Sequence, residues 1–301
     1  MPSEAQAKSL VCVGNLTIDQ AVRSGVRSAP AMGGDAAYAA LAAKLFVDDV
    51  RMFAPIGTDL PSWVLESIRS VGITAEELPV RNLPTVRNVI NYFPDGTRVW
   101  DMLCSEEDFD ALSVYPADVP PSVLAADALM LSAMSFESQI ALTPWMRKNS
   151  SAVLYLDLQE DYLVGNREAL FSIIAASDVF LPSEVEAVEL SGTRNLEAAA
   201  RTFAALGPKT VVIKRAEQGS LVLEHDVITR VPAESIDPVD STGAGDAFCG
   251  AFAAVHLETG DAVAAARAGS TAARIAISDF GIAPLLAECN VRARLISRER
   301  R

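Results

Sequence analysis

The sequence predicts an α/β fold, and three observations support this prediction. Short apolar segments alternate with amphipathic segments of helical spacing, most regularly from Asp127 onward. Of the 301 residues, 50% are hydrophobic, which is enough for a large core. Two strand-like segments around Pro94-Asp95-Gly96 interrupt the alternation, so we expect a β-hairpin that packs outside the main sheet. No repeat or long polar linker divides the chain, so we expect residues 1–301 to form one domain.

The length and spacing of the apolar runs place the elements along the chain. In the first half we expect strands at 10–13 and 50–54, helices at 36–43 and 61–71, hairpin strands at 85–93 and 97–102, and a loop at 106–126. In the second half we expect strands at 128–131, 152–158, 179–181, 210–214, 220–223 and 227–231. Helices are expected at 137–148 and 167–175, after Ser183, after Gly245, and at 261–277 and 285–296.

The composition limits the partners and the location of the protein. Its formal net charge of −14, from 39 acidic and 25 basic residues, would repel nucleic acid and anionic membranes. No segment has the pattern of a secretory signal, and none reaches the ~20 apolar residues of a membrane span. The four cysteines are widely separated, which favours free thiols in a reducing compartment. We therefore expect a cytoplasmic protein that binds neither nucleic acid nor membranes.

The segment from Asp240 to Phe248 carries the strongest functional signal. An apolar run of helical spacing follows it, so Gly243 to Asp246 should lie at a helix N-terminus, where free N–H groups attract phosphate. Gly243 and Gly245 have no side chain, so an anion can approach the backbone. A carboxylate repels phosphate, but Asp246 would serve as a general base if it faced a substrate hydroxyl. The alternative is an acidic residue in an ordinary tight helix start.

Candidate residues for a hydroxyl-bearing substrate lie near the first strand. Asp19 follows the end of that strand, where ligands gather in open α/β sheets, although it could also be a turn aspartate. Gly33 and Gly34 allow a ligand near the backbone, but such a pair is also typical of a plain loop. Asp35 adds a second carboxylate, and Tyr38 offers an aromatic face and a hydroxyl. Two carboxylates would repel a sugar phosphate, so we expect a neutral polyhydroxylated acceptor.

Several other enzyme classes lack their motifs in this chain. There is no Gly-x-x-x-x-Gly-Lys-Ser/Thr sequence, which excludes a P-loop enzyme. Gly243-Ala244-Gly245 begins like a dinucleotide-binding fingerprint, but Phe248 stands in the place of the third glycine. His225 and His256 are the only histidines, and there is no Gly-x-Ser-x-Gly elbow, so a zinc site or a Ser-His-Asp triad has little basis.

Asp240-Ser241-Thr242-Gly243-Ala244-Gly245-Asp246-Ala247-Phe248, together with Gly250, resembles the C-terminal signature of the ribokinase-like, PfkB-type carbohydrate kinases. The resemblance covers nearly the whole chain. It implies a Rossmann-type central sheet flanked by helices, with a small β lid formed by segments of about 16–30 and 84–102. It also implies an ATP- and Mg²⁺-dependent kinase that phosphorylates a hydroxyl of a small sugar, polyol or nucleoside. The lid hairpin has more apolar surface than an exposed hairpin should carry, so we expect it to cover the site and to form a homodimer contact.

The same resemblance implies roles for single residues. Asp246 would be the base, with Gly243, Ala244 and Gly245 as the anion hole. Asp19, Gly33 and Gly34 would bind the acceptor, and Lys214 and Gly219 would lie beside the nucleotide phosphates. Ser183 and Glu186 stand where the family has Asn-x-x-Glu, which helps to place magnesium, and Asp240 and Thr242 fall at positions that bind a monovalent cation such as K⁺ in some members.

Three positions depart from the family pattern. Tyr38 and Ser183 each replace an asparagine, and Ala216 replaces a frequent glycine. Ser183 and Glu186 also fit a capping box, which needs no metal. Two other functions stay open: a catalytically inactive binding or regulatory protein on the same fold, and an unrelated nucleotide-dependent enzyme such as a dehydrogenase. The retained Asp246 argues against the first, and the missing third glycine argues against the second.

Overall fold

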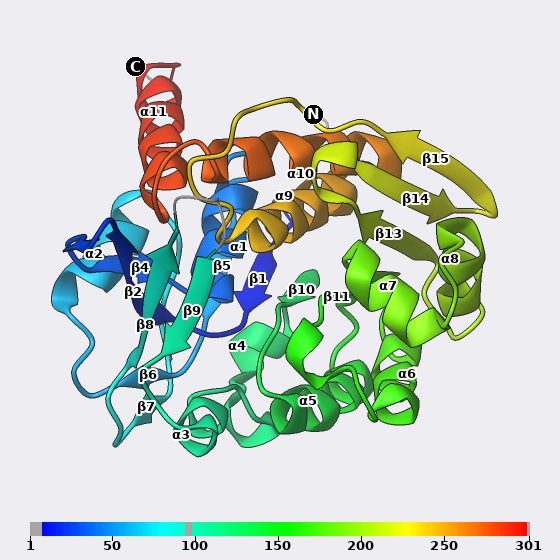
Figure 1. The fold of residues 1–301 in the computed structure, drawn as a ribbon, viewed down its shortest axis with the longest axis horizontal. Coiled ribbons are helices and arrows are strands. Elements are labelled where there is room, and N and C mark those ends of the chain that lie inside the picture. Colours follow the sequence, from blue (N-terminus) through cyan, green and yellow to red (C-terminus); the bar gives the residue numbers. More distant parts are fainter. Residues whose placement is uncertain (1–7, 94–97, 300–301) are drawn as a thin grey trace, which may run out of the picture.

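A central sheet of eight strands with helices on both faces forms the body of the protein in a computed structural model that describes residues 8–93 and 98–299 (Figure 1). The strand order is β15-β14-β13-β12-β11-β10-β1-β5. Neighbouring strands from β13 to β5 are parallel, and β14 is antiparallel to both of its neighbours. The strands are β1 (Leu10–Val13), β5 (Val50–Phe53), β10 (Ala128–Leu131), β11 (Val153–Leu156), β12 (Val179–Phe180), β13 (Thr210–Lys214), β14 (Ser220–Glu224) and β15 (Val227–Val231).

Alternate residues of the buried strands serve two separate cores. In β1, Leu10 and Cys12 join one apolar cluster, whereas Val11 and Val13 join the other. The first cluster packs under α1 (Asp35–Lys44), α2 (Ser62–Ser70), α9 (Ala244–Thr259), α10 (Ala262–Ala276) and α11 (Ala283–Glu299). The second packs under α4 (Pro121–Leu124), α5 (Phe136–Asn149), α6 (Arg167–Ala175), α7 (Glu184–Ser191) and α8 (Leu196–Ala204). The sheet is therefore covered on both faces, as predicted for an α/β fold.

A second sheet of five strands lies beside the first and is called the lid below (Figure 1). It contains β2 (Thr17–Arg23), β3 (Val26–Arg27), β4 (Ala31–Gly33), β8 (Val86–Tyr92) and β9 (Arg98–Met102). The predicted hairpin is present as the antiparallel pair β8–β9, and β2 pairs with β8 in parallel. The expected turn Pro94-Asp95-Gly96 lies outside the described residues. Two short strands, β6 (Ile56–Gly57) and β7 (Val80–Arg81), form a further parallel pair.

The prediction of a loop at 106–126 was wrong. That segment contains α3 (Glu106–Ala111), a short 3₁₀ turn and α4. Ser105 caps α3 by accepting a hydrogen bond from the N–H of Asp108 at 3.0 Å, and Pro121 opens α4 at a position where proline costs no hydrogen bond. The helix α8 was not predicted. Its N-cap is Asn195, whose side chain accepts hydrogen bonds from the N–H groups of Glu197 and Ala198.

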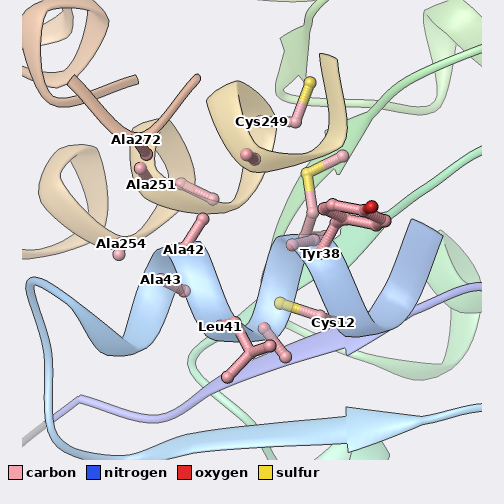
Figure 2. Close-up of a cluster of buried hydrophobic side chains, with 14 of the residues drawn as sticks. Cys12, Tyr38, Leu41, Ala42, Ala43, Cys249, Ala251, Ala254 and Ala272 are labelled. Carbon is pink, nitrogen blue, oxygen red and sulfur yellow. The ribbon is translucent and has the colours of Figure 1, made fainter. Parts of the chain in front are cut away.

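The helices α1 and α9 pack with their backbones almost in contact. A Cβ built on Gly250 of α9 would lie 2.0 Å from the carbonyl oxygen of Ala39 in α1, so only glycine fits there. Figure 2 shows small side chains of this core, among them Ala42 of α1, Ala254 of α9, and Ala251 of α9 beside Ala272 of α10. The small side chains of α1 and α9 therefore allow these two helices to pack closely. The N-termini of the same helices carry the site described next.

Candidate active site

The predicted site residues gather at the carboxyl ends of the parallel strands, beside the N-termini of α1 and α9. Asp35 opens α1, with Gly34 as its N-cap, and Asp246 lies in the first turn of α9, with Gly243 as its N-cap. Lys214 ends β13. The edge of the sheet at which a doubly wound fold binds ligands therefore holds most of the candidate residues.

The turn that starts α9 depends on its glycines for two different reasons. Gly243 has φ 72°, in the left-handed region, and a Cβ on it would lie 2.3 Å from two ring carbons of Tyr38. Gly245 faces the other way, and a Cβ on it would lie 3.7 Å from Nζ of Lys214. The N–H group of Ala244 donates to the carbonyl oxygen of Ser241 at 3.4 Å. The backbone of Gly245 and the ammonium group of Lys214 lie side by side, which is a suitable arrangement for phosphate oxygens.

Lys214 is held in a buried ion pair with Asp157. Its Nζ donates to Oδ1 and Oδ2 of Asp157 at 2.6 and 2.7 Å, and it also lies 3.3 Å from Sγ of Cys249. Burial by itself lowers the pKa of Lys214, but the negative charge and the hydrogen bonds of Asp157 outweigh it, and the net shift is upward. The side chain is thus a permanently positive group at the start of α9.

Carboxylates outnumber this single ammonium group. Burial and the nearby Asp157 raise the pKa of Asp246 to about 6, although Lys214 opposes the shift. Burial and Asp157 likewise raise the pKa of Glu186 to about 8. The pKa of Asp35 is raised by burial and by the charges of Asp246, Asp157 and Asp19. These aspartates repel one another, so the site favours ligands that bring positive charge or hydrogen-bond donors.

Asp19 lies in the lid strand β2, and the neighbouring strand β8 supports it. Its Oδ1 accepts hydrogen bonds from Oγ1 of Thr17 and Nδ2 of Asn88, each at 2.8 Å. Burial raises its pKa to about 6, against the effect of these two donors. A Cβ on Gly33 would lie 1.9 Å from Oδ2 of Asp19, so this glycine makes room for the carboxylate itself. Gly34 has φ 96° and lies against the backbone of Asn15.

Tyr38 does not offer the free aromatic face that was expected. Its side chain is only 2% exposed, and one face of the ring carries Gly243. Burial raises its pKa, as do the charges of Asp19, Asp240 and Asp246. In this arrangement the ring supports the turn at the start of α9.

Asp240, one of the two residues expected to bind a monovalent cation, has protein donors around its carboxylate. Oδ1 accepts from the hydroxyl of Tyr92 and from the N–H of Thr242, and Oδ2 accepts from the N–H of Gly281. Tyr92 belongs to lid strand β8, and the guanidinium of Arg23 in β2 lies 5.7 Å from the centre of its ring. The lid and the turn before α9 are thus directly connected.

Ser183 and Glu186 form the capping box that their spacing predicts. The N–H of Glu186 donates to Oγ of Ser183 at 3.1 Å, and the N–H of Ser183 donates to Oε2 of Glu186 at 2.8 Å. Gly219 closes the turn between β13 and β14 with φ 84°, where a Cβ would lie 2.0 Å from the carbonyl oxygen of Val231. Among the described residues, no group of three or more His, Cys, Asp or Glu side chains is placed to hold a metal ion, and no helix is long and apolar enough to cross a membrane.

A comparison with known protein families matches residues 7–288 to the pfkB family of carbohydrate kinases. The chain belongs to this family. It is 29% identical over 277 residues to a cytidine kinase of Thermococcus kodakarensis, a match that covers 90% of this chain and 97% of the relative. The structure resembles that of a ribokinase from Giardia lamblia with a TM-score of 0.77 at 21% identity, covering 95% of this chain and 99% of that one. It also resembles a putative ribokinase II from E. coli in complex with ATP and Mg²⁺, with a TM-score of 0.77 at 20% identity, covering 97% of this chain and 99% of that one.

Membership of the family makes the chain a phosphotransferase with the ribokinase-like fold. Three residues of this kinase that the sequence analysis did not single out lie within the same site. Asp157 directly follows β11. Ligands gather at the carboxyl ends of the strands in such sheets, and this reasoning, which pointed to Asp19, also applies to Asp157. Asn88 contacts Asp19, and its Oδ1 is buried without a hydrogen-bond partner among the described residues. Asn15 lies just beyond the end of β1. Its buried Oδ1 also has no hydrogen-bond partner among the described residues. Such buried acceptors would suit the hydroxyl groups of a ligand.

Proposed function

We propose that this PfkB-family kinase transfers the γ-phosphate of ATP to a hydroxyl of a small neutral sugar, polyol or nucleoside. The single observation that carries this proposal is the position of Asp246. Its carboxylate lies in the same helical turn as the N–H groups from Gly243 to Gly245, close to Lys214. One turn therefore presents a base to an alcohol and an anion site to a phosphoryl group.

The chemistry follows from this arrangement. The acceptor hydroxyl attacks the γ-phosphorus, its proton passes to Asp246, and the bond to the bridging oxygen of ATP breaks to release ADP. A pKa of about 6 makes Asp246 a stronger base than an ordinary aspartate, yet still deprotonated at neutral pH. Gly243, Ala244 and Gly245 supply the anion hole. The positive charge of Lys214 offsets the negative charge of the transferred phosphoryl group.

The residues at the site fit a magnesium ion that arrives with ATP. No three of the described acidic side chains form a ready-made metal site, and Mg²⁺ commonly takes most of its ligands from phosphate oxygens and water. Glu186 would hold that water shell indirectly from the start of α7, with Ser183 beside it. Bound magnesium would neutralise charge on the phosphates. Gly219 would serve the nucleotide only indirectly, by allowing the tight turn after β13 against the backbone of Val231.

The acceptor would lie between Asp19, Asp35 and the glycine pair Gly33-Gly34. Asp19 and Asn88 present oxygen atoms that can accept hydrogen bonds from ligand hydroxyls. The relative from Thermococcus kodakarensis is named a cytidine kinase, and that match supports a nucleoside as one candidate acceptor. Tyr38 would affect acceptor binding only indirectly, by supporting the turn at the start of α9.

The lid would cover this site and join two copies of the chain. Trp100 pairs with Ile90 in the β8–β9 hairpin, on the face that carries Asn88, and is 46% exposed. Val99 pairs with Asn91 on the other face and is 49% exposed. The first face would close over the acceptor, and the second would contact the partner subunit of a homodimer.

The remaining parts of the proposal concern organisation and environment. Residues 1–301 would act as one kinase domain, with lid segments 16–30 and 84–102, in the cytoplasm. All four cysteines are free, which fits a reducing compartment. A potassium ion at Asp240 and Thr242 would have to share the carboxylate with its present hydrogen-bond donors. Activity that rises when K⁺ replaces a bulky organic cation would support such a site.

A coupled assay for ADP release tests the main proposal. The wild-type chain is supplied with Mg²⁺-ATP and a panel of cytidine, ribose, deoxyribose, fructose and inositol, each matched where possible with its phosphorylated form. We expect turnover with at least one neutral compound and little with its phosphorylated counterpart, since Asp19 and Asp35 would repel the second phosphate. A clear preference for phosphorylated acceptors would contradict the acceptor class, and no turnover with any alcohol would contradict the transfer itself.

A further inference from the structure

A cavity of about 450 Å³ lies on the face of the sheet that is opposite to α9, at the start of α8. Three arginines, Arg194, Arg215 and Arg230, line it together with Glu184 and Glu197. Its volume falls in the range of small-molecule sites in proteins. The proposed kinase reaction uses none of these five side chains.

Strand alternation separates this cavity from the candidate active site. Lys214 ends β13 and points toward Asp157, under α9. The next residue, Arg215, points to the opposite face, where its Nε donates to Oε2 of Glu184 at 3.0 Å. Arg230 in β15 pairs across the sheet with Leu221, whose side chain belongs to the core on that same face. The two sites thus share a strand end but not a side chain.

The cavity carries positive charge in a chain whose net charge is −14. Glu184 is paired with Arg215, and Glu197 is paired with Arg230 at 2.6 Å. Arg194 is exposed and forms no ion pair within the part of the chain that the structure describes. The cap of α8 is already occupied, because Asn195 Oδ1 accepts from the first N–H groups of that helix. The attraction for an anion would therefore come from the guanidinium groups.

We propose that this cavity binds a phosphomonoester, with the phosphoryl group held by Arg194 and Arg230 and an organic body the size of a sugar or nucleoside in the remaining volume. Guanidinium groups present paired N–H donors that match phosphate oxygens. A single phosphate ion would fill only a small part of the cavity, whereas a sugar phosphate would occupy much more of it. The proposal is independent of the kinase reaction, because neither arginine contacts the candidate active site.

Isothermal titration calorimetry at ~0.15 M salt tests this site. The protein is first saturated with Mg²⁺ and a non-hydrolysable ATP analogue, so that the nucleotide site cannot take up the probe. Ribose 5-phosphate is then titrated, with ribose and inorganic phosphate as separate probes. We expect one site per chain for ribose 5-phosphate and weaker binding of phosphate. Any binding of ribose would belong to the proposed acceptor site and should be the same in the wild-type chain and in the double variant described next.

The decisive comparison uses two variants. Arg194→Ala combined with Arg230→Ala should weaken the binding of ribose 5-phosphate at least tenfold. Arg201→Ala is the matched control, because Arg201 lies in α8, is exposed, and also has a carboxylate nearby, but does not line the cavity. Both replaced arginines are exposed, so the fold should be retained, and a thermal melt checks this. No binding to the wild-type chain, or equal affinity in the double variant, would overturn the proposal. Equal affinity for phosphate and ribose 5-phosphate would contradict the space assigned to the organic body.

Discussion

The ring of Tyr38 lies so close to Gly243 that a Cβ built on this glycine would be 2.3 Å from two of the ring carbons. Tyr38 belongs to α1, and Gly243 is the N-cap of α9, so the contact joins the two helices that carry the candidate active site. The aromatic ring of Tyr38 thus fixes the position of the turn that is proposed to bind phosphate. The shape of the turn proposed to bind phosphate therefore depends on Tyr38.

Gly243→Ala should therefore disturb the turn in two ways, through its positive φ and through the clash with Tyr38. We expect a loss of stability of about 1–3 kcal/mol and a higher KM for ATP. Gly260→Ala is the matched control, because Gly260 also has a positive φ but a Cβ there would meet open space. Thermal melts and steady-state kinetics compare the two variants. If both lose the same stability and keep the same KM, the contact with Tyr38 does not shape the turn.

Asp246→Asn should fold and bind ATP but lose activity. Removing a positioned general base typically costs ~10²-fold or more in rate, and the asparagine keeps the size and polarity of the side chain. The measurement is kcat with the best acceptor, alongside ATP affinity by calorimetry. Asp226→Asn, at an exposed residue in the turn between β14 and β15, is the control and should leave both values unchanged. Wild-type turnover by the Asp246 variant would exclude this residue as the base.

The activity should fall in mildly acidic solution. Asp246 and Asp19 both have pKa values raised to about 6, and each must be ionised to accept a hydrogen bond or proton from the acceptor. We expect kcat/KM to decrease below about pH 6 with a slope of at least tenfold per pH unit. A profile that stays flat from pH 7 to pH 5 would contradict these roles.

The same raised pKa values have the opposite effect on stability. The folded state holds the proton of Asp246 more tightly than the unfolded state, so this contribution is fully present below pH 3.8 and is lost as the pH rises through about 6. The wild-type Tm should therefore decrease over that interval because of this residue. Asp246→Asn should show a smaller decrease, which a series of thermal melts from pH 4 to pH 8 can measure.

Asn88→Ala should raise the KM for the acceptor. The change removes a hydrogen bond to Asp19 and an unpartnered oxygen, and one such bond contributes about 0.5–1.5 kcal/mol, or roughly 2- to 12-fold in KM. The KM for ATP should stay unchanged. Asn91→Ala is the control, because Asn91 is three residues away on the other face of β8 and bonds to Asp101. Equal effects of the two variants on acceptor KM would place the acceptor elsewhere.

Val99→Asp should weaken a homodimer that forms through the outer face of the lid. Val99 is 49% exposed, so a charged side chain there should disturb the partner contact but not the subunit fold. Sedimentation at micromolar concentration measures the assembly, with Val80→Asp as a control at an exposed valine of β7. Val89 is only 5% exposed, and Val89→Asp would instead test the stability of the lid. A wild-type chain that sediments as a monomer would contradict the dimer.

Much of the fold could be predicted because its signals are local. The strands at 10–13, 128–131, 210–214 and 227–231 and the helix at 167–175 match the structure residue for residue, since apolar runs and their flanking turns mark them. The capping box of Ser183 and Glu186 is local in the same way. By contrast, α8 has a cap and an apolar face but follows α7 after only a short turn, and the whole helix was missed.

The contacts that complete the site could not be predicted, because they join distant parts of the chain. Lys214 and Asp157 are separated by 57 residues, and Tyr92 and Asp240 by 148. Both pairs depend on the strand order and on the position of the lid, which no spacing in the sequence specifies. The burial of Tyr38 under Gly243 likewise appears only when α1 and α9 are packed together.

The close packing of α1 and α9 has a consequence for how such an enzyme can be changed. Gly250 and the alanines between these helices leave no free volume, so the distance between Asp35 and Asp246 cannot be adjusted by one substitution at a time. The lid strands carry Asn88 and Trp100 and do not share that interface. Directed evolution toward new acceptors should therefore accumulate its useful mutations in the lid, while libraries that target the helix interface should yield mostly unfolded protein.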